Sequence, residues 1–195
     1  MNWIKHPLIL KGELITLKLL EHNHFDELID LAGNKEIWKY YTIDGSNPII
    51  LRESLERSLI EREKGTQYPF VIVKNDNMKL IGSTRFLDIQ SEHKKLEIGW
   101  TWLHPDYWGT SINLECKLLL LTYCFEELNT KRVQLKTDEN NIRSRKAIEK
   151  IGGKFEGILR NDMIRYNGAN RNSAYYSILD IEWGMVKVDL LKLLM

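Results

Sequence analysis

The residues best placed to do chemistry form a short turn at 107–113, Tyr-Trp-Gly-Thr-Ser-Ile-Asn, between a predicted strand and a predicted long helix. A loop that opens a helix presents unpaired backbone N–H groups to an anion, at the positive end of the helix dipole. The turn is therefore a candidate phosphate site built mainly from main-chain groups. The alternative is an ordinary tight connection, because a single glycine such as Gly109 often marks nothing more.

Two polar positions flank this turn in the sequence. Glu97 lies in the preceding strand, and Asn141 opens a second polar helix start, Asn-Ile-Arg-Ser-Arg-Lys-Ala-Ile-Glu-Lys-Ile-Gly-Gly. Strand, helix, strand and helix follow one another here, an order that calls for a parallel crossover. This context favours the functional interpretation of the turn.

The strands that must position these groups follow from the alternation of apolar residues. Strands are predicted at 15–19, 70–73, 80–89, 96–103 and 133–137, and two more, at 155–166 and 174–179, flank the favoured hairpin dipeptide Asn167-Gly168. In the fourth strand, strict alternation places Leu96, Ile98, Trp100 and Trp102 on one face and Glu97, Gly99 and Thr101 on the other.

Helices are predicted where apolar residues recur every three or four positions. They run from Asn23 to Gly33, from Ser46-Asn47-Pro48 to Gly65, over 114–128, from Asn141 to 151 and over 181–194. The helix at 114–128 is apolar on so many sides that it should be nearly buried. Trp38, Tyr40 and Tyr41, between the first two helices, can be either core aromatics or walls of a substrate pocket.

Composition narrows the class of protein. The 195 residues, 43% of them hydrophobic, suit one globular domain spanning 1–195, and a net charge of +1 gives no reason to expect nucleic acid or a membrane surface as partner. No apolar run approaches the roughly 20 residues of a membrane span, and the first ten residues lack a signal sequence, so we expect a cytoplasmic chain.

Cysteine and histidine spacing point away from disulfide and metal chemistry. Cys116 and Cys124 lie eight residues apart on one predicted helix, about 12 Å at 1.5 Å per residue, too far to bridge each other. We expect both to be reduced and buried. His22 and His24 have the wrong spacing for one face of a helix, and no metal site is expected.

Three segments together resemble a known family. Leu-Glu-Ile-Gly-Trp at 96–100, His-Pro-Asp-Tyr-Trp-Gly-Thr at 104–110 and Lys-Thr-Asp-Glu-Asn-Asn-Ile-Arg-Ser-Arg-Lys-Ala-Ile-Glu-Lys-Ile-Gly-Gly at 136–153 resemble the GNAT superfamily of acyl-CoA N-acyltransferases, in its RimJ/RimL-type branch. The resemblance covers residues 14–183. It implies an α/β fold with a central, mostly antiparallel mixed sheet of about seven strands, splayed between the fourth and fifth and flanked by helices. It also implies acetyl-CoA in the opening and direct transfer of its acetyl group to an amine.

The resemblance also assigns roles to single residues. Glu97 matches the position of a general base, which the chemistry needs because an amine is nucleophilic only after losing a proton. Asn141 matches a residue that hydrogen-bonds the pantetheine arm of the cofactor, and Ser144 one that protonates the leaving thiolate. The remaining cofactor-binding residues implied are Thr101, Trp102 and Leu103, through their main chain, and Trp108, Gly109, Thr110, Ser111, Ile112 and Asn113.

Each role has a structural alternative. Glu97 can be a strand residue in a salt bridge, and Asn141 and Ser144 have the spacing of an ordinary helix cap. The basic cluster of Arg143, Arg145, Lys146 and Lys150 can meet nucleotide phosphates or form a solvated helix face.

The turn departs from the family's usual pyrophosphate loop, which reads Gln or Arg, two free positions, Gly, one free position, then Gly or Ala. Those places hold Trp108, Ser111 and Asn113, and although Gly109 is kept, both small positions carry a side chain. Because main-chain N–H groups do the binding, we expect weakened or re-posed rather than lost CoA binding.

Two hypotheses result. The first is an acetyl-CoA-dependent N-acetyltransferase acting on a primary amine of a small molecule or a protein N-terminus, as a monomer or homodimer. The second is a GNAT-fold module, catalytically weak or inactive, that binds CoA or a small ligand.

Overall fold

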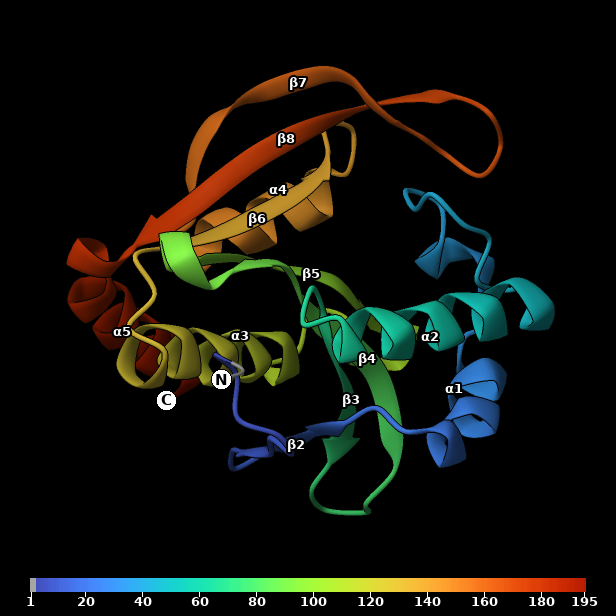
Figure 1. The fold of residues 1–195 in the computed structure, drawn as a ribbon, viewed down its shortest axis with the longest axis horizontal. Coiled ribbons are helices and arrows are strands. Elements are labelled where there is room, and N and C mark those ends of the chain that lie inside the picture. The colour runs from blue at the N-terminus through green and yellow to red at the C-terminus, as the bar shows by residue number, and fades with distance from the viewer. Residues whose placement is uncertain (1–2) are drawn as a thin grey trace.

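A computed structural model describes residues 3–195, which contain one eight-stranded mixed sheet (Figure 1). The strands are β1 (Leu10–Lys11), β2 (Ile15–Leu19), β3 (Tyr68–Lys74), β4 (Leu80–Gln90), β5 (Lys95–Leu103), β6 (Arg132–Asp138), β7 (Lys154–Ile164) and β8 (Asn170–Leu179), in the order β1-β2-β3-β4-β5-β6-β8-β7. Every neighbouring pair is antiparallel except β5 with β6. The expected mixed, mostly antiparallel sheet is confirmed. It has one strand more than expected, because β1 is too short to give a sequence period.

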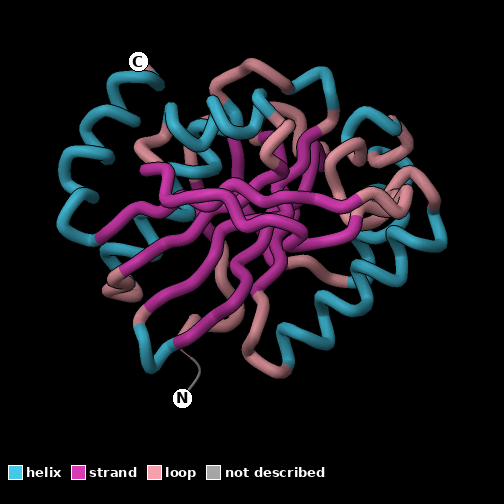
Figure 2. Tube along the Cα trace, turned by 90° about the horizontal axis from the view of Figure 1, so that it is seen from above, coloured by secondary structure: helices cyan, strands magenta, loops and turns pink. Residues whose placement is uncertain are grey.

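Five α-helices flank the sheet on both sides, as the view from above shows (Figure 2). They are α1 (Phe25–Leu31), α2 (Pro48–Glu63), α3 (Ile112–Thr122), α4 (Ile142–Lys150) and α5 (Asp180–Leu194). A π-helical turn at Tyr123–Glu127 extends α3, so the long helix predicted over 114–128 is confirmed, with a change of winding near its end. Among residues 3–195, no helix combines the length and apolarity needed to cross a bilayer.

The core consists of two clusters, one on each side of the sheet. Strand β3 serves both, since Phe70 and Ile72 pack on the side of α3 and α5 while Val71 and Val73 pack on the side of α1 and α2. This double burial explains why β3 is a continuous apolar run rather than an alternating one. Cys116 and Cys124 are free and buried in the first cluster, as predicted.

The sheet opens between its two parallel strands. Strands β5 and β6 are paired with each other only from Lys95 to Glu97, opposite Arg132 to Gln134. Beyond these residues the two strands separate, while β5 stays paired with β4 and β6 with β8. Helix α3 follows the free end of β5 and α4 follows the free end of β6, so both helices begin near the opening (Figure 1). This is the splay expected between the fourth and fifth predicted strands, and it is confirmed.

A buried carboxylate ties α3 to the edge of the sheet. The two oxygens of Glu115 accept hydrogen bonds from the N–H groups of Glu13, Leu14 and Ile15 at 2.8–3.2 Å. A Cβ on Gly12 would lie 2.6 Å from the carboxyl carbon of Glu115, so this close approach requires glycine. The contact fixes the start of β2 against α3, the helix that follows the turn at 107–113.

Replacing Glu115 by Gln should lower the free energy of unfolding by about 2 kcal/mol, because an amide group then faces main-chain donors that need an acceptor. Urea denaturation measures this loss. Glu127→Gln, at an exposed position in the π-helical turn that extends α3, is the matched control and should leave the free energy of unfolding unchanged. Equal stability of the two variants would show that the Glu115 contacts contribute nothing.

Candidate active site

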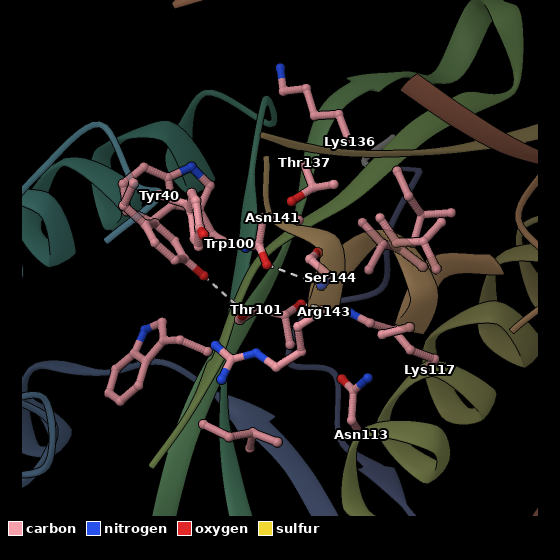
Figure 3. A pocket seen from close by; sticks show the side chains of 18 of the residues that line it. Tyr40, Trp100, Thr101, Asn113, Lys117, Lys136, Thr137, Asn141, Arg143 and Ser144 are labelled. Carbon is pink, nitrogen blue, oxygen red and sulfur yellow. Dashed lines mark hydrogen bonds between the residues drawn. The ribbon is translucent and has the colours of Figure 1, made fainter. Parts of the chain in front are cut away.

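A cavity of about 480 Å³ occupies the opening between β5 and β6 (Figure 3). Its walls come from residues 37–42, the outer half of β5, the turn after it, β6, and the pocket-facing sides of α3 and α4. Of the expected site residues, Glu97, Thr101, Trp102, Leu103, Trp108, Gly109, Asn113, Asn141 and Ser144 line it, whereas Thr110, Ser111 and Ile112 do not. The sequence therefore located the cavity, though not every side chain that faces it. No group of His, Cys, Asp and Glu side chains within residues 3–195 is arranged to hold a metal ion.

Within residues 3–195, the turn leaves several of its main-chain N–H groups without a partner. Gly109 has a φ of 75°, in the left-handed region, and a Cβ there would meet nothing within 4 Å. The N–H groups of Gly109, Thr110, Ser111 and Asn113 have no hydrogen-bond partner in the described chain. The turn thus offers several main-chain donors, as predicted from its position.

The two unusual positions of the turn behave differently. Ser111 stands at the N-cap of α3 without a side-chain cap bond, and it does not line the cavity. Asn113 does line the cavity, and its amide points toward the opening (Figure 3). Ile112 is buried in the core, so only its main chain is available to a ligand. The extra side chains leave the donors of the turn open.

Strand β5 contains a bulge that corrects the predicted alternation. Gly99 pairs with Arg85 and Trp102 with Ser83, so β5 advances by three residues where β4 advances by two. Trp100, within this bulge, has a φ of 51°. After the bulge the faces exchange, so that Trp100 and Trp102 pack on the α1–α2 side, opposite the cluster that holds Leu96 and Ile98. The expectation that these four share one face is wrong. Side chains alternate between the two faces of a strand, so one extra residue moves every later side chain to the opposite face.

The bulge gathers polar contacts at Thr101. The Tyr41 hydroxyl donates to the Thr101 carbonyl at 2.9 Å, and Lys117 donates to the Thr101 hydroxyl at 2.5 Å. Burial raises the pKa of Tyr41 to about 12. Tyr40 and Tyr41 line the cavity, whereas Trp38 is fully buried in the core. Trp38 is therefore a core aromatic, whereas Tyr40 and Tyr41 form part of the cavity wall.

The main-chain groups expected to meet the pantetheine already have partners. Besides the Thr101 carbonyl, the Leu103 carbonyl accepts a hydrogen bond of 3.0 Å from the indole N–H of Trp108. These bonds fix the position of β5 along the cavity wall. A second lone pair on each oxygen remains for a ligand.

Glu97 is a buried carboxylate at the inner end of the opening. Its side chain is 6% exposed, it accepts a hydrogen bond from Gln134 at 2.8 Å, and the Lys136 ammonium lies 3.4 Å away. Burial raises the pKa of Glu97, and the nearby charge of Lys136 opposes this only in part. The salt-bridge alternative therefore describes its contacts, and Glu97 also lines the cavity.

Asn141 caps α4 and also faces the cavity. Its side-chain oxygen accepts a hydrogen bond from the Ser144 N–H at 3.1 Å, the dashed line beside both labels in Figure 3. Ser144 lines the same cavity. Capping and cavity lining thus coincide in one residue.

The basic cluster on α4 is divided. The guanidinium of Arg143 stacks on the Trp108 ring, with 3.6 Å between the guanidinium carbon and the ring centre. Arg143 therefore reaches from α4, after β6, across the cavity to the turn after β5 (Figure 3). Arg145 donates to the Tyr176 hydroxyl at 2.9 Å, while Lys146 and Lys150 are exposed. Only Arg143 belongs to the cavity, and the other members form contacts outside it or a solvated face.

Three cavity cations, Lys117, Lys136 and Arg171, were missed from the sequence, and Lys136 is the one that pairs with Glu97. Lys117 and Arg171 are both buried, and neither has a carboxylate within 4.0 Å among residues 3–195. Burial lowers the pKa of Lys117. A lysine within the apolar run of the long helix was a usable signal, since a charge is seldom fully buried without a reason. Arg171 gave no signal, because its place depends on how the β7–β8 hairpin folds back.

Comparison with known proteins identifies the architecture. Residues 15–154 match the family model described as an acetyltransferase (GNAT) domain. The chain is 29% identical over 183 residues to the "Putative ribosomal N-acetyltransferase YdaF" of Bacillus subtilis (strain 168), covering 88% of this chain and 94% of that protein. It is 31% identical to the crystal structure of a "putative acetyltransferase" from T. thermophilus, with a TM-score of 0.87 over 98% of this chain and 100% of that one.

A third similarity concerns the fold alone. The structure of Mycobacterium smegmatis RimJ in complex with CoA-disulfide has a TM-score of 0.81 and 18% identity, covering 96% of this chain and 95% of that one. The fold and the opened sheet are those of the N-acetyltransferase class. The chain belongs to the acetyltransferase (GNAT) domain family and is an acetyltransferase. The resemblance noted in the sequence is confirmed, including the RimJ-like fold.

Proposed function

We propose that this single-domain acetyltransferase moves the acetyl group of acetyl-CoA directly to a primary amine, of a small molecule or a protein N-terminus. One observation supports this most strongly. A single cavity has an open main-chain anion site on one arm and a buried carboxylate of raised pKa at its inner end. Such a cavity can hold a phosphate-bearing donor and deprotonate an acceptor beside it.

The donor side uses main-chain groups first. The free N–H groups at 109–113 would hold the pyrophosphate, and Arg143, which already spans the opening at Trp108, would turn toward a phosphate. Asn141 has its amide N–H₂ available while its oxygen caps α4, so it would donate to the pantetheine arm.

The chemistry balances with two protein groups. The amine nitrogen attacks the thioester carbonyl carbon, a C–N bond forms and the C–S bond breaks. The proton lost from the ammonium group goes to the Glu97 carboxylate, directly or through water. As the C–S bond breaks, the Ser144 hydroxyl gives its proton to the departing thiolate and regains one from the nitrogen, which loses a second proton on becoming the amide. Both groups line the cavity. General acid–base assistance of this kind contributes roughly 10²–10⁴-fold in rate.

Transfer without an acyl-enzyme intermediate is supported by the cysteines. Cys116 and Cys124 are fully buried and neither lines the cavity, and burial raises the pKa of Cys116 to about 11. A thiol in that state is a poor nucleophile. The kinetics should therefore be sequential rather than ping-pong.

The proposal is tested by incubating the protein with acetyl-CoA and a panel of primary amines. Free thiol release and a mass increase of one acetyl group on the amine are the expected results, with intersecting double-reciprocal lines. Binding of acetyl-CoA by calorimetry, without transfer to any amine, would point instead to a GNAT-fold binding module.

The pH dependence of kcat/KM should report Glu97. A raised pKa means that the carboxylate is protonated at a higher pH than in an exposed glutamate, so activity should fall as pH decreases through that raised pKa. A pH–rate profile with saturating acetyl-CoA measures the position of this acid limb. A limb at the ordinary pKa of glutamate would remove Glu97 from the role of base.

A further inference from the structure

The cavity contains more positive charge than its own carboxylates can balance. The charged residues of its wall are the cations Lys117, Lys136, Arg143 and Arg171 and the acids Asp88 and Glu97. Lys136 pairs with Glu97, and Asp88 is exposed at the rim. Since the whole chain is almost neutral, with a net charge of +1, this excess is local. It has to be explained by what the cavity binds.

Arg171 is the cation that the donor site does not explain. It lies at the start of β8, in the hairpin that reaches over residues 35–47 (Figure 1). Its hydrogen-bond partner Tyr40 lies across the cavity from Asn113 of the turn (Figure 3). Arg171 is 9% exposed, and among residues 3–195 its guanidinium donates only to the Tyr40 carbonyl, at 3.3 Å. Its Nε is buried and has no partner within residues 3–195.

A guanidinium in this state lacks its usual acceptor. Burial of an arginine is normally compensated by a carboxylate or phosphate that accepts two parallel hydrogen bonds. The neighbouring Arg165 has such a partner in Asp138, at 2.6 Å, whereas no carboxylate within the described residues lies within 4.0 Å of Arg171. The unmet donors of Arg171 belong to a residue of the cavity wall, so a ligand in the cavity can satisfy them.

Arg171 shares the cavity with the proposed base. Its hydrogen bond to the Tyr40 carbonyl ties it to residues 37–42, where the next residue, Tyr41, donates to the Thr101 carbonyl on the bulge of β5. Arg171 and Glu97 both line this cavity of about 480 Å³. An acceptor whose amine is near Glu97 can therefore place a second group near Arg171.

We propose that the acceptor is a small primary amine that carries an acidic group, carboxylate or phosphate, and that Arg171 binds this group. The inference rests on the proposed acetyl transfer and names the acceptor class for it. Arg171 sets specificity by binding a part of the acceptor that does not react, which leaves the amine free for Glu97. A neutral amine leaves the guanidinium buried and unsatisfied and is therefore discriminated against.

The test compares matched acceptors at fixed acetyl-CoA. One arm uses ω-amino carboxylic acids of increasing chain length, each against its primary amide, and a second uses phosphoethanolamine against ethanolamine. In whichever of these two arms gives faster turnover, the wild type should prefer the acidic amine over its neutral partner. The expected preference is roughly tenfold to hundredfold in kcat/KM, the range of a charge-assisted hydrogen bond. A third arm offers the same acids within tetrapeptides, and faster turnover there would contradict a small acceptor.

Three variants separate binding of the acid from a structural role. Arg171→Gln should lose the preference, Arg171→Lys should keep part of it, and Arg160→Gln, an exposed position on β7 of the same hairpin, should leave it unchanged. If Arg171 serves only the fold, Arg171→Gln lowers turnover of acidic and neutral amines equally. That result, or equal use of each pair by the wild type, would overturn the proposal.

Binding keeps the two proposals distinguishable. Calorimetric titration of the acidic and neutral amines, with CoA present, should show that only the acid binds and that Arg171→Gln removes the difference, whether or not acetyl transfer occurs. Turnover of neutral amines as fast as acidic ones refutes the inference and keeps the acetyltransferase function. Absence of turnover with any amine, together with selective binding of the acid, refutes the acetyltransferase function and keeps the inference that Arg171 binds an acidic group.

Discussion

Replacing Glu97 by Gln should lower kcat by roughly 10²–10⁴-fold, the range typical of a lost general base, with little change in the KM for acetyl-CoA. The substitution keeps the volume of the side chain and an oxygen that Gln134 can still donate to, at the position of the present 2.8 Å hydrogen bond. It removes the group that accepts the ammonium proton. Steady-state kinetics with acetyl-CoA and the best amine of the panel measures the effect.

The control for this prediction is Glu92→Gln, an exposed glutamate in the turn between β4 and β5. It should behave as the wild type. The acid limb of the pH profile should also disappear in Glu97→Gln, which a loss of stability alone would not produce. Undiminished turnover would mean that the buried carboxylate serves only its ion pair with Lys136.

Replacing Gly109 by Val should weaken acetyl-CoA binding by roughly 100-fold. A β-branched residue is strained at a φ of 75°, by at least about 1–2 kcal/mol, and it will pull the turn into another conformation. The N–H groups then no longer converge on the pyrophosphate, and losing one charge-assisted hydrogen bond costs about 1.5–3 kcal/mol. Calorimetric titration with acetyl-CoA measures the change in Kd.

The chain offers a matched control in Gly65. This glycine ends α2 at the same φ of 75°, is exposed, and has nothing within 4 Å of its missing Cβ. Gly65→Val should lose similar stability and bind acetyl-CoA as the wild type does. If both variants bind equally well, the turn at 107–113 is not the phosphate site.

The sequence was a good guide wherever local patterns decide the structure. The helix starts at Asn47-Pro48 and Asn141 were correct because caps are local and Asn side chains accept the first N–H groups. The parallel pairing of β5 with β6 followed from the order of elements, whereas the opening between them was implied by the family resemblance. These features need no knowledge of distant contacts.

The errors occurred where distant parts of the chain decide. The bulge at Trp100 depends on its pairing with β4 and on the stacking of Arg85, whose guanidinium lies 4.4 Å from the Trp100 ring centre. Arg171 enters the cavity only because the β7–β8 hairpin packs against Tyr40. No spacing rule within either segment contains this information.

The central claim is that acetyl-CoA binds in the opening between β5 and β6 with its phosphates on the turn at 107–113. Amide hydrogen exchange of the full chain, with and without saturating CoA, tests this directly, because the free N–H groups of Gly109, Thr110, Ser111 and Asn113 exchange unprotected unless a ligand binds them. We predict that CoA slows exchange at 109–113 and along the outer half of β5. Binding of CoA with unchanged exchange at these amides would contradict the account.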